Sequence, residues 1–266
     1  MKRVAVIIPT FNRRHCLGRC LKSVLNQTFD DYELMVVDDC STDGTEHHPL
    51  LSEPRVGYEK LPARHGVSFA RNYGVQCTTA PLLAFCDSDD EWHTNKLEHQ
   101  CAFIDNNPSF RISQTKEIWI RHGIRVNPPQ THEKVGGDIF EPSLHRCMIT
   151  PSSVIIDRDL FRDTGGFNES FVACEDYDLW LRITWKYMAG LVGEYLLTRY
   201  GGHDDQLSST VFALDRFRIR SILNILYRVP LSVHQRIQAK EVLVKKANIV
   251  ARGFKKRGDR RCYEQY

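Results

Sequence analysis

Three aspartates directly follow a short apolar run in the first half of this chain. The run is LLAFC at residues 82–86, and Asp87, Asp89 and Asp90 come immediately after it. A short apolar run of this kind is typical of a buried β-strand, and α/β sheets bind ligands beyond the carboxyl ends of their strands. Acids so close together repel one another unless a cation is present, and divalent cations shared with substrate phosphates prefer oxygen ligands. The cluster therefore predicts a sheet edge that binds a metal ion and a diphosphate.

Strand and helix patterns alternate through the first half of the chain. Apolar runs predict strands at residues 4–8, 33–38, 55–60 and 82–86. With helical patterns between them, this order predicts an α/β fold with a mostly parallel, Rossmann-like central sheet and helices on both faces. The less regular second half predicts strands at 112–120 and 152–156, an amphipathic helix at 177–188 and helices at 208–227 and 232–252. Thr94 and Asp159 are expected to cap helices.

Composition indicates a globular protein of the cytoplasm. The chain has 266 residues, of which 42% are hydrophobic, but no run approaches the roughly 20 apolar residues needed to span a bilayer. The nine cysteines include no C-x-x-C pair. This pattern predicts reduced thiols and argues against both a disulfide framework and a zinc site.

Positive charge is concentrated at the C-terminal end. Residues 216–266 hold 14 Lys and Arg against three Asp and Glu, whereas the remaining chain holds 22 against 30. A basic tail on an acidic body fits a peripheral contact with the anionic inner face of a membrane. A solvated basic helix explains the pattern equally well, and the tail could also pair two subunits. No nucleic-acid partner is predicted.

Two further strand ends carry polar side chains. The first strand leads into Pro9, Thr10, Phe11 and, after Asn12, Arg13, where backbone, hydroxyl and guanidinium donors could hold a base and a phosphate. The second strand ends in Asp38 and Asp39, and a carboxylate there can accept hydrogen bonds from a base or a ribose hydroxyl. A single acid in this place could simply form a turn. Two in series, with the acidic cluster elsewhere, favour a nucleotide site.

A fourth candidate is the pair Glu175 and Asp176, which precedes the helix expected at 177–188. The unsatisfied N–H groups of a first helical turn stabilise an ionised carboxylate. A general base at neutral pH must be ionised, so this pair is a candidate for proton abstraction. The alternative is simple charge complementarity at a helix N-terminus, which is the better explanation for Asp178.

Together these motifs resemble those of the family 2 nucleotide-sugar glycosyltransferases, which have the GT-A fold. The similar segments are residues 6–13 (VIIPTFNR), 36–45 (VVDDCSTDGT), 70–74 (ARNYG), 85–92 (FCDSDDEW), 165–169 (GGFNE) and 174–182 (CEDYDLWLR). Each motif alone is common, but the ordered series is specific and covers most of the chain. The processive Q-x-x-R-W motif is absent, which suggests a single-addition enzyme.

The resemblance implies a role for each site residue. Asp39 looks like the family's base-contacting acid, for uracil if the donor is UDP-linked, and Arg71 like a donor-contacting arginine. The nucleotide-binding set is Pro9, Thr10, Phe11, Arg13, Asp39, Arg71, Asp87 and Ser88. Asp87 and Asp89 match the D-x-D motif, in which the last acid binds Mn²⁺ or Mg²⁺ on the diphosphate. His203 is a candidate third metal ligand, although a histidine in such a loop is more often a surface residue.

The resemblance also implies a reaction. Asp176, with Glu175 beside it, matches the catalytic acids of the family, and Asp176 would act as the base. The enzyme would transfer a sugar, with inversion, from a nucleotide-sugar donor to a hydroxyl of a glycan or a lipid-linked acceptor in the synthesis of cell-surface polysaccharide or glycoconjugate. Residues 1–107 would bind the nucleotide sugar, 108–207 would bind the acceptor and supply the base, and 208–266 would form a basic helical extension.

Two other functions are compatible with parts of this sequence. A sugar nucleotidyltransferase can share the same sheet, but it usually has a glycine-rich loop after the first strand, and residues 9–13 contain no glycine. A non-catalytic module that binds a sugar nucleotide or a membrane is the other alternative. The presence of all the expected acids argues against it, and hydrolysis of the donor would distinguish the two.

Overall fold

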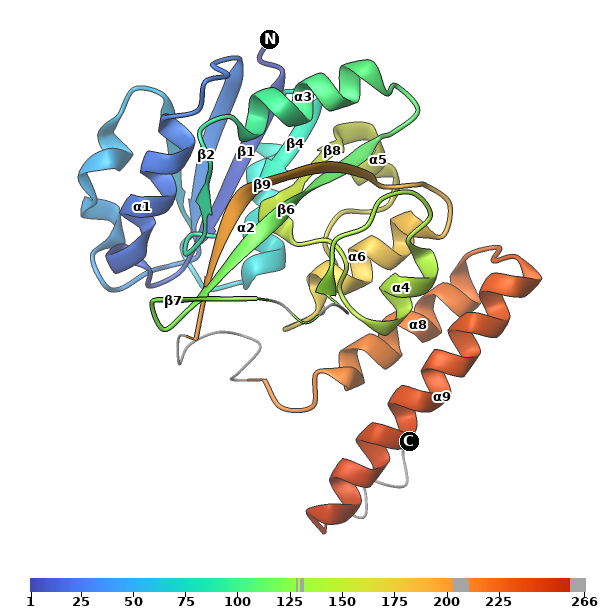
Figure 1. The fold of residues 1–266 in the computed structure, drawn as a ribbon. Helices are drawn as coiled ribbons and strands as arrows, with labels where there is room; N and C mark the ends of the chain where they lie inside the picture. Colours follow the sequence, from blue (N-terminus) through green and yellow to red (C-terminus); the bar gives the residue numbers. More distant parts are fainter. Residues whose placement is uncertain (128, 130–131, 203–210, 259–266) are drawn as a thin grey trace.

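The computed structural model describes residues 1–127, 129, 132–202 and 211–258 (Figure 1). The strands are β1 (Val4–Thr10), β2 (Tyr32–Asp38), β3 (Val56–Lys60), β4 (Leu82–Phe85), β5 (Glu91–Trp92), β6 (Ile112–Arg121), β7 (Ile124–Val126), β8 (Val154–Asp157) and β9 (Gly190–Gly201). The helices are α1 (Arg14–Leu25), α2 (Val67–Gln76), α3 (Lys96–Asn106), α4 (Phe140–His145), α5 (Arg158–Asp163), α6 (Glu175–Thr184), α8 (Asp215–Arg228) and α9 (Val233–Lys256). Short 3-10 turns are η1 (Thr45–His47), η2 (Pro49–Ser52) and η4 (Pro151–Ser153).

A single mixed sheet organises the described part of the chain. Its strand order is β3-β2-β1-β4-β8-β6-β9-β5, and β7 pairs with β6. Strands β3, β2, β1 and β4 are parallel, β8 is antiparallel to both of its neighbours, and β6 is parallel to β9. Parallel strands direct their carboxyl ends to one edge, so β1, β2 and β4 deliver their following loops to a common place.

Helices cover both faces of the sheet, as the sequence predicts. Alternate residues of β1 point to opposite faces: Val6 packs with α1 and α3, whereas Ile7 packs with α5 and α6. Every residue of β1 is buried, which explains its continuous apolar run. Gly74 of α2 lies against Ile7, and a Cβ at this position would come within 2.5 Å of the Ile7 side chain. The predicted α/β fold is therefore confirmed.

The structure corrects several element ends. The helix expected at 177–188 is α6, which ends at Thr184. The half-buried Trp185 continues the apolar spacing although it lies outside the helix. The sequence pattern therefore predicted a helix that is too long. Asp157, not Asp159, caps α5 by accepting a hydrogen bond from the Leu160 N–H. Thr94 does not cap α3, whose N-cap residue is Asn95. The carbonyl of Thr94 instead accepts hydrogen bonds from Thr28.

The strand expected at 152–156 and the helix expected at 208–227 also begin later than predicted. The first of these segments begins with the turn η4 before β8, and α8 begins at Asp215. Residues 203–210, which include His203, lie outside the described residues. Strand β9 was not predicted. It carries three glycines, and its pairing with β6 shifts register at Lys116.

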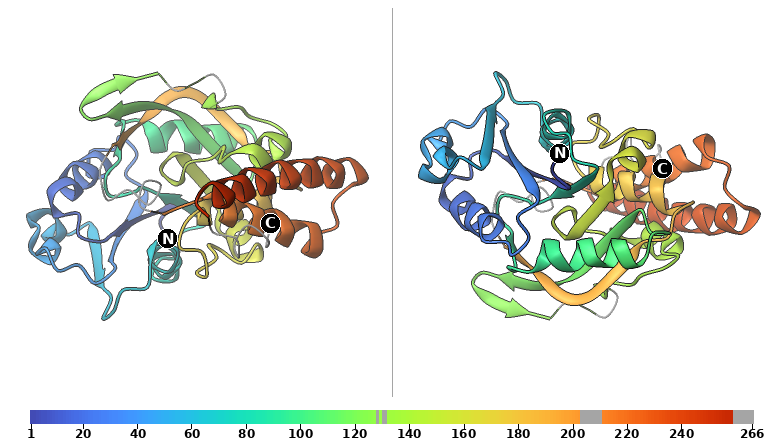
Figure 2. Two further views of the ribbon diagram at one scale, coloured as in Figure 1. Left: turned by 90° about the horizontal axis from the view of Figure 1, so that it is seen from below. Right: turned by 90° about the horizontal axis from the view of Figure 1, so that it is seen from above.

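Helices α8 and α9 form a hairpin at the end of the molecule remote from β2 and β3 (Figure 2). Their apolar residues, among them Ile222 and Val242, form one core cluster with residues of α4 and α6. The hairpin thus packs against the helix that begins with Glu175 and Asp176. None of the helices in the described ranges combines the length and apolarity that crossing a membrane requires.

Candidate functional site

A cleft of about 620 Å³ lies at the carboxyl ends of β1, β2 and β4 and at the first turn of α6. Every site residue predicted from the sequence lines it, except His203, which is outside the described residues. These lining residues are Pro9, Thr10, Phe11, Arg13, Asp39, Arg71, Asp87, Ser88, Asp89, Glu175 and Asp176. Segments separated by more than a hundred positions in the sequence therefore meet in one place.

Asp39 is held rigidly at one end of this cleft. Its two carboxylate oxygens accept hydrogen bonds from the backbone N–H groups of His65 and Gly66, each at 2.7 Å. Gly66 has a φ of 95°, a conformation that favours glycine. Each carboxylate oxygen keeps a second lone pair, so Asp39 can accept further bonds from a ligand. The nearby Thr10 hydroxyl is buried and has no hydrogen-bond partner among the described residues, which leaves a donor for the same ligand.

Aromatic and cationic side chains close this end of the cleft. The Arg64 guanidinium lies 4.0 Å from the centre of the Phe11 ring, and His65 stacks on Phe69 with ring centres 4.3 Å apart. Flat surfaces of this kind suit a planar base. Phe11 was predicted. Arg64 and His65 were not, because a short polar loop after β3 has no distinguishing pattern in the sequence.

Arg71 joins two of the predicted acids in the centre of the cleft. Its guanidinium donates to Asp87 Oδ1 and to Glu175 Oε1, both at 2.7 Å. The Arg71 side chain is 4% exposed and that of Glu175 is 8% exposed, whereas that of Asp87 is 29% exposed. Burial raises the pKa of Glu175 in spite of the opposing attraction of Arg71. The Glu175 carboxylate is therefore occupied by its ion pair with Arg71. Asp176, the next acid in the chain, has no ion pair with a described residue.

Asp90 differs from the other acids of its cluster. It is buried, accepts a 2.6 Å hydrogen bond from the Ser152 hydroxyl, and accepts another from the Tyr200 N–H. Burial, and then repulsion from Asp89, raise the pKa of Asp90 well above its usual value. Asp90 therefore holds the loop to η4 and β9, and Asp87 and Asp89 are the acids of this cluster whose carboxylates could ligate a cation.

The fit of a divalent cation depends on Asp87 and Asp89. In the described ranges no group of three or more His, Cys, Asp or Glu side chains is arranged to hold a metal ion. Two carboxylates are nevertheless sufficient for a cation that takes its other ligands from water and substrate phosphates. The donor set therefore fits Mg²⁺ or Mn²⁺ bound together with a diphosphate.

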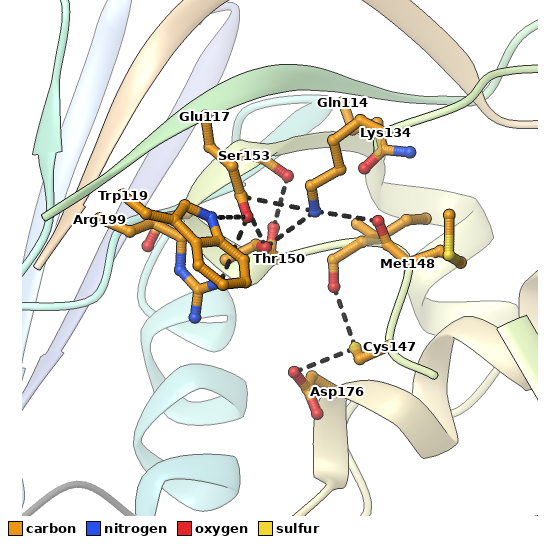
Figure 3. Close-up of polar contacts among 12 residues, drawn as sticks. Gln114, Glu117, Trp119, Lys134, Cys147, Met148, Thr150, Ser153, Asp176 and Arg199 are labelled. Carbon is orange, nitrogen blue, oxygen red and sulfur yellow. Dashed lines mark hydrogen bonds and ion pairs between the residues drawn. The ribbon is translucent and has the colours of Figure 1, made fainter. Parts of the chain in front are cut away.

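Asp176 lies in the first turn of α6, after Cys174 with a φ of 60°. The Cys147 Sγ lies 3.2 Å from Asp176 Oδ2 and donates to it (Figure 3). Burial, and then the charge of Asp176, raise the pKa of Cys147 well above its usual value, so the thiol keeps its proton. The first-turn position leaves backbone N–H groups directed at the carboxylate, and Tyr177 N–H donates to Oδ1 at 2.7 Å.

A second pocket of about 370 Å³ meets the cleft at Asp176. Both hollows are lined by Thr150, Glu175, Asp176, Arg199 and Tyr200. The second pocket extends along β6 and β9 to α8 and includes Trp119 and Arg121, which lie in the segment 108–207 that was expected to bind the acceptor.

A buried polar network forms the floor of the second pocket (Figure 3). Glu117 accepts hydrogen bonds from the Trp119 indole at 2.7 Å and from the Thr150 hydroxyl at 2.8 Å. Lys134 and Arg199 lie 3.4 and 3.2 Å from its carboxylate. Burial alone would raise the pKa of Glu117, but these two cations hold it at about 2. The hydrogen bonds and ion pairs of this network were not predicted, because a single lysine and a single glutamate give no sequence signal of burial.

Comparisons with known proteins agree with this geometry. A family model described as Glycosyl transferase family 2 matches residues 5–152. The chain is 34% identical over 182 residues to the UDP-Glc:alpha-D-GlcNAc-diphosphoundecaprenol beta-1,3-glucosyltransferase WfgD of Escherichia coli, covering 68% of this chain and 69% of WfgD. It is 29% identical to WfaP of Escherichia coli, which bears the same description, over 89% of this chain and 90% of WfaP.

The fold is also similar to a solved structure. The crystal structure of S. aureus TarS 1-349 in complex with UDP-GlcNAc superposes with a TM-score of 0.72 at 21% identity, covering 95% of this chain and 73% of that one. At this identity the similarity concerns the fold alone, which is the fold expected from the sequence.

Proposed function

The chain belongs to glycosyl transferase family 2, and from this premise we propose that it moves a sugar from a nucleoside-diphosphate sugar to an acceptor hydroxyl with inversion. The observation that carries the proposal is the convergence of three strand ends and the first turn of α6 on one cleft. This cleft contains a rigid acceptor of hydrogen bonds in Asp39, two carboxylates suited to a cation and a candidate base in Asp176. A bound nucleotide sugar would thus have its sugar end next to that base.

We propose a UDP-linked donor and a lipid-linked acceptor, because the relatives at 34% and 29% identity are described as using UDP-Glc and a diphosphoundecaprenol-linked GlcNAc. Their described product is a β-1,3 linkage, and an α-linked donor gives a β-linked product by a single displacement. The rigid Asp39 carboxylate at the base end of the cleft supports the same choice, since it can accept the imide N–H of uracil.

A cation has a clear electrostatic reason to enter the cleft with the donor. The cleft lining contains seven carboxylic acids and four arginines, so a diphosphate alone would meet an excess of negative charge. Asp87 and Asp89 would hold Mn²⁺ or Mg²⁺, and the ion would neutralise the leaving diphosphate. The Asp87 side chain is 29% exposed, so part of it is available for this contact.

The side chains of the chain itself would then orient and deprotonate the acceptor. Asp176 lies where the two hollows meet, so a hydroxyl presented from the second pocket would approach the donor sugar past this carboxylate. Asp176 would remove the hydroxyl proton as the new bond forms. Arg71 would keep Glu175 and Asp87 in place, and this positioning supplies part of the rate enhancement.

A transfer assay tests the proposal directly. Purified protein would be incubated with UDP-glucose, Mn²⁺ and GlcNAc linked through an α-diphosphate to a decyl chain. We expect acceptor-dependent release of UDP and a β-linked disaccharide. Release of pyrophosphate would instead support a nucleotidyltransferase. Donor binding without any transfer or hydrolysis would support the non-catalytic module.

Metal dependence gives the first mutational prediction. We expect UDP to raise the melting temperature of the wild type only when Mn²⁺ is present, because a ligand that binds the folded state stabilises it by mass action. Asp89→Ala should remove most of this shift, whereas the exposed control Asp159→Ala should keep it. An equal UDP shift for Asp89→Ala and wild type would contradict the assigned role. GDP, dTDP and CDP in the same panel test the choice of base.

We also propose that the α8–α9 hairpin holds the enzyme peripherally at the inner face of a membrane, in the cytoplasm. Val233, Ile237 and Val244 are 78%, 51% and 59% exposed, and their spacing places them on one face of α9 together with Lys240. An amphipathic basic face binds anionic lipid through buried apolar area and charge. Cosedimentation with phosphatidylglycerol vesicles should fall at least about threefold in Val244→Glu. Equal binding to uncharged vesicles would contradict the proposal.

A further inference from the structure

The two hollows that meet at Asp176 differ in charge. The cleft is lined by more carboxylic acids than cations, whereas the second pocket is lined by five Lys and Arg side chains and three carboxylates. The five cations are Arg121, Lys134, Arg146, Arg199 and Arg218. The cleft therefore needs a metal ion to accept an anion, but the second pocket carries its own positive charge.

Most of the negative charge in the second pocket is already compensated. Glu117 has two cationic neighbours, Lys134 and Arg199, and Glu175 is paired with Arg71, which does not line this pocket. Asp176 is the remaining carboxylate of the lining. The excess of positive charge consequently comes from the other three arginines of the lining, Arg121, Arg146 and Arg218.

Arg146 is the arginine with the clearest capacity for a ligand. It follows α4 directly and is half-buried, and its buried Nε has no hydrogen-bond partner in the part of the chain that the structure describes. Within the described ranges, no ion pair of its guanidinium is found. A buried N–H without a partner costs free energy, and a planar guanidinium is well suited to two phosphate oxygens at once. Arg146 is thus prepared for an anionic ligand.

Two neighbours of Arg146 support a positive field in this pocket. The pKa of His132 is lowered by burial and then by the charges of Arg146 and Lys134. Arg218, which also lines this pocket, comes from α8 and is held by Asp215 at 2.9 Å. The C-terminal hairpin therefore contributes a cation to the pocket as well as packing against α6.

We propose that this second pocket binds the diphosphate group of the acceptor, with Arg146 as its principal contact and Arg121 and Arg218 as further cations. The inference rests on the proposed function and specifies how the acceptor is recognised. A diphosphate diester is a dianion, and it would be attracted here without a metal ion. A sugar attached to it would extend toward the junction of the two hollows, where its hydroxyl meets Asp176. The Trp119 ring lines the same pocket, with the Arg121 and Arg199 guanidinium groups 5.3 and 5.4 Å from its centre.

A binding measurement tests this pocket without requiring turnover. The protein would be saturated with UDP and Mn²⁺ so that the cleft is filled, and decyl diphosphate would then be titrated by calorimetry. We expect the wild type to bind it and Arg146→Gln to bind it at least about tenfold more weakly, the loss of one strong charged hydrogen bond. Arg146→Lys should recover part of the affinity. Arg162→Gln, a change of an arginine that is 70% exposed on α5, is the control.

The transfer assay supplies a second readout. With GlcNAc linked to decyl diphosphate, Arg146→Gln should raise KM roughly tenfold or more, whereas with the uncharged decyl glycoside of GlcNAc the two proteins should differ little. A short-chain methyl diphosphate acceptor separates recognition of the diphosphate from recognition of the lipid chain, and should show the same loss.

The possible outcomes separate the two proposals. If the wild type fails to bind decyl diphosphate, or if Arg146→Gln weakens charged and uncharged acceptors equally, the pocket assignment is overturned while sugar transfer can still stand. If decyl diphosphate binds through Arg146 but no acceptor yields UDP, the pocket assignment is supported and the proposed function is overturned. A retained melting-temperature shift with UDP shows that Arg146→Gln is folded.

Discussion

Asp176→Asn is expected to lower kcat for sugar transfer by roughly 10² to 10⁴-fold, the usual contribution of a general base, while the protein still binds UDP in the presence of Mn²⁺. The amide has nearly the same shape as the carboxylate but cannot take up the hydroxyl proton. Its single oxygen can still accept the hydrogen bond from the Tyr177 N–H, and the Cys147 thiol keeps the Ile149 carbonyl as an acceptor, so the local structure should persist. Initial rates of UDP release at saturating donor and acceptor provide the measurement.

The comparison with a second variant makes this test specific. Asp159→Asn changes an acid that is 62% exposed on α5, and it should keep the wild-type rate. Normal turnover by Asp176→Asn would remove Asp176 from the mechanism and leave the cleft with donor binding alone.

The part of the site that could be predicted from the sequence is the part that follows strand ends. Asp39 and Asp87 directly follow buried apolar runs, and parallel strands bring such positions to one edge whatever the sequence separation. Asp176 was predicted for a related reason, since an acid at the start of an amphipathic helix has a defined electrostatic environment. In each case a short sequence pattern, a strand end or a helix start, is enough to indicate where the side chain lies in the fold.

The second pocket could not be predicted in this way. Lys134 comes from a loop near two glycines and Arg199 from a strand that was missed, yet both converge on Glu117 of β6. Arg199 comes close to Glu117 because β6 and β9 pair in parallel across some eighty residues of sequence, with a shift in register at Lys116. No rule of composition or spacing indicates such a pairing. Two cations of the proposed acceptor site, Arg146 and Arg218, therefore became evident only in the folded chain.

Arg71→Met is expected to destabilise the protein by about 3 to 5 kcal/mol, the cost typical of removing one partner from a buried ion pair. The substitution leaves Glu175, 8% exposed, and Asp87, 29% exposed, without the cation that joins them. Urea denaturation monitored by tryptophan fluorescence gives the change in unfolding free energy. Arg162→Met, which removes an exposed arginine paired with Asp159, should cost less than about 1 kcal/mol.

The pH dependence of this loss identifies Glu175 as its cause. In the wild type the pKa of Glu175 is already raised above its ordinary 4.5 by burial, so the folded state binds the proton more tightly than the unfolded state, and stability falls as pH rises through that interval. Without Arg71 the opposing attraction disappears and the pKa rises further. The stability lost in Arg71→Met should therefore be smallest below the pKa of Glu175 in the unfolded chain, and should increase with pH until Glu175 ionises in the folded variant.

A second substitution, Glu175→Gln, should recover stability at neutral pH and flatten the pH dependence of the loss, because the buried Glu175 charge is then absent beside the vacated position. If the deficit instead stayed constant from pH 4 to 8, packing of the arginine side chain, rather than compensation of Glu175, would be its origin.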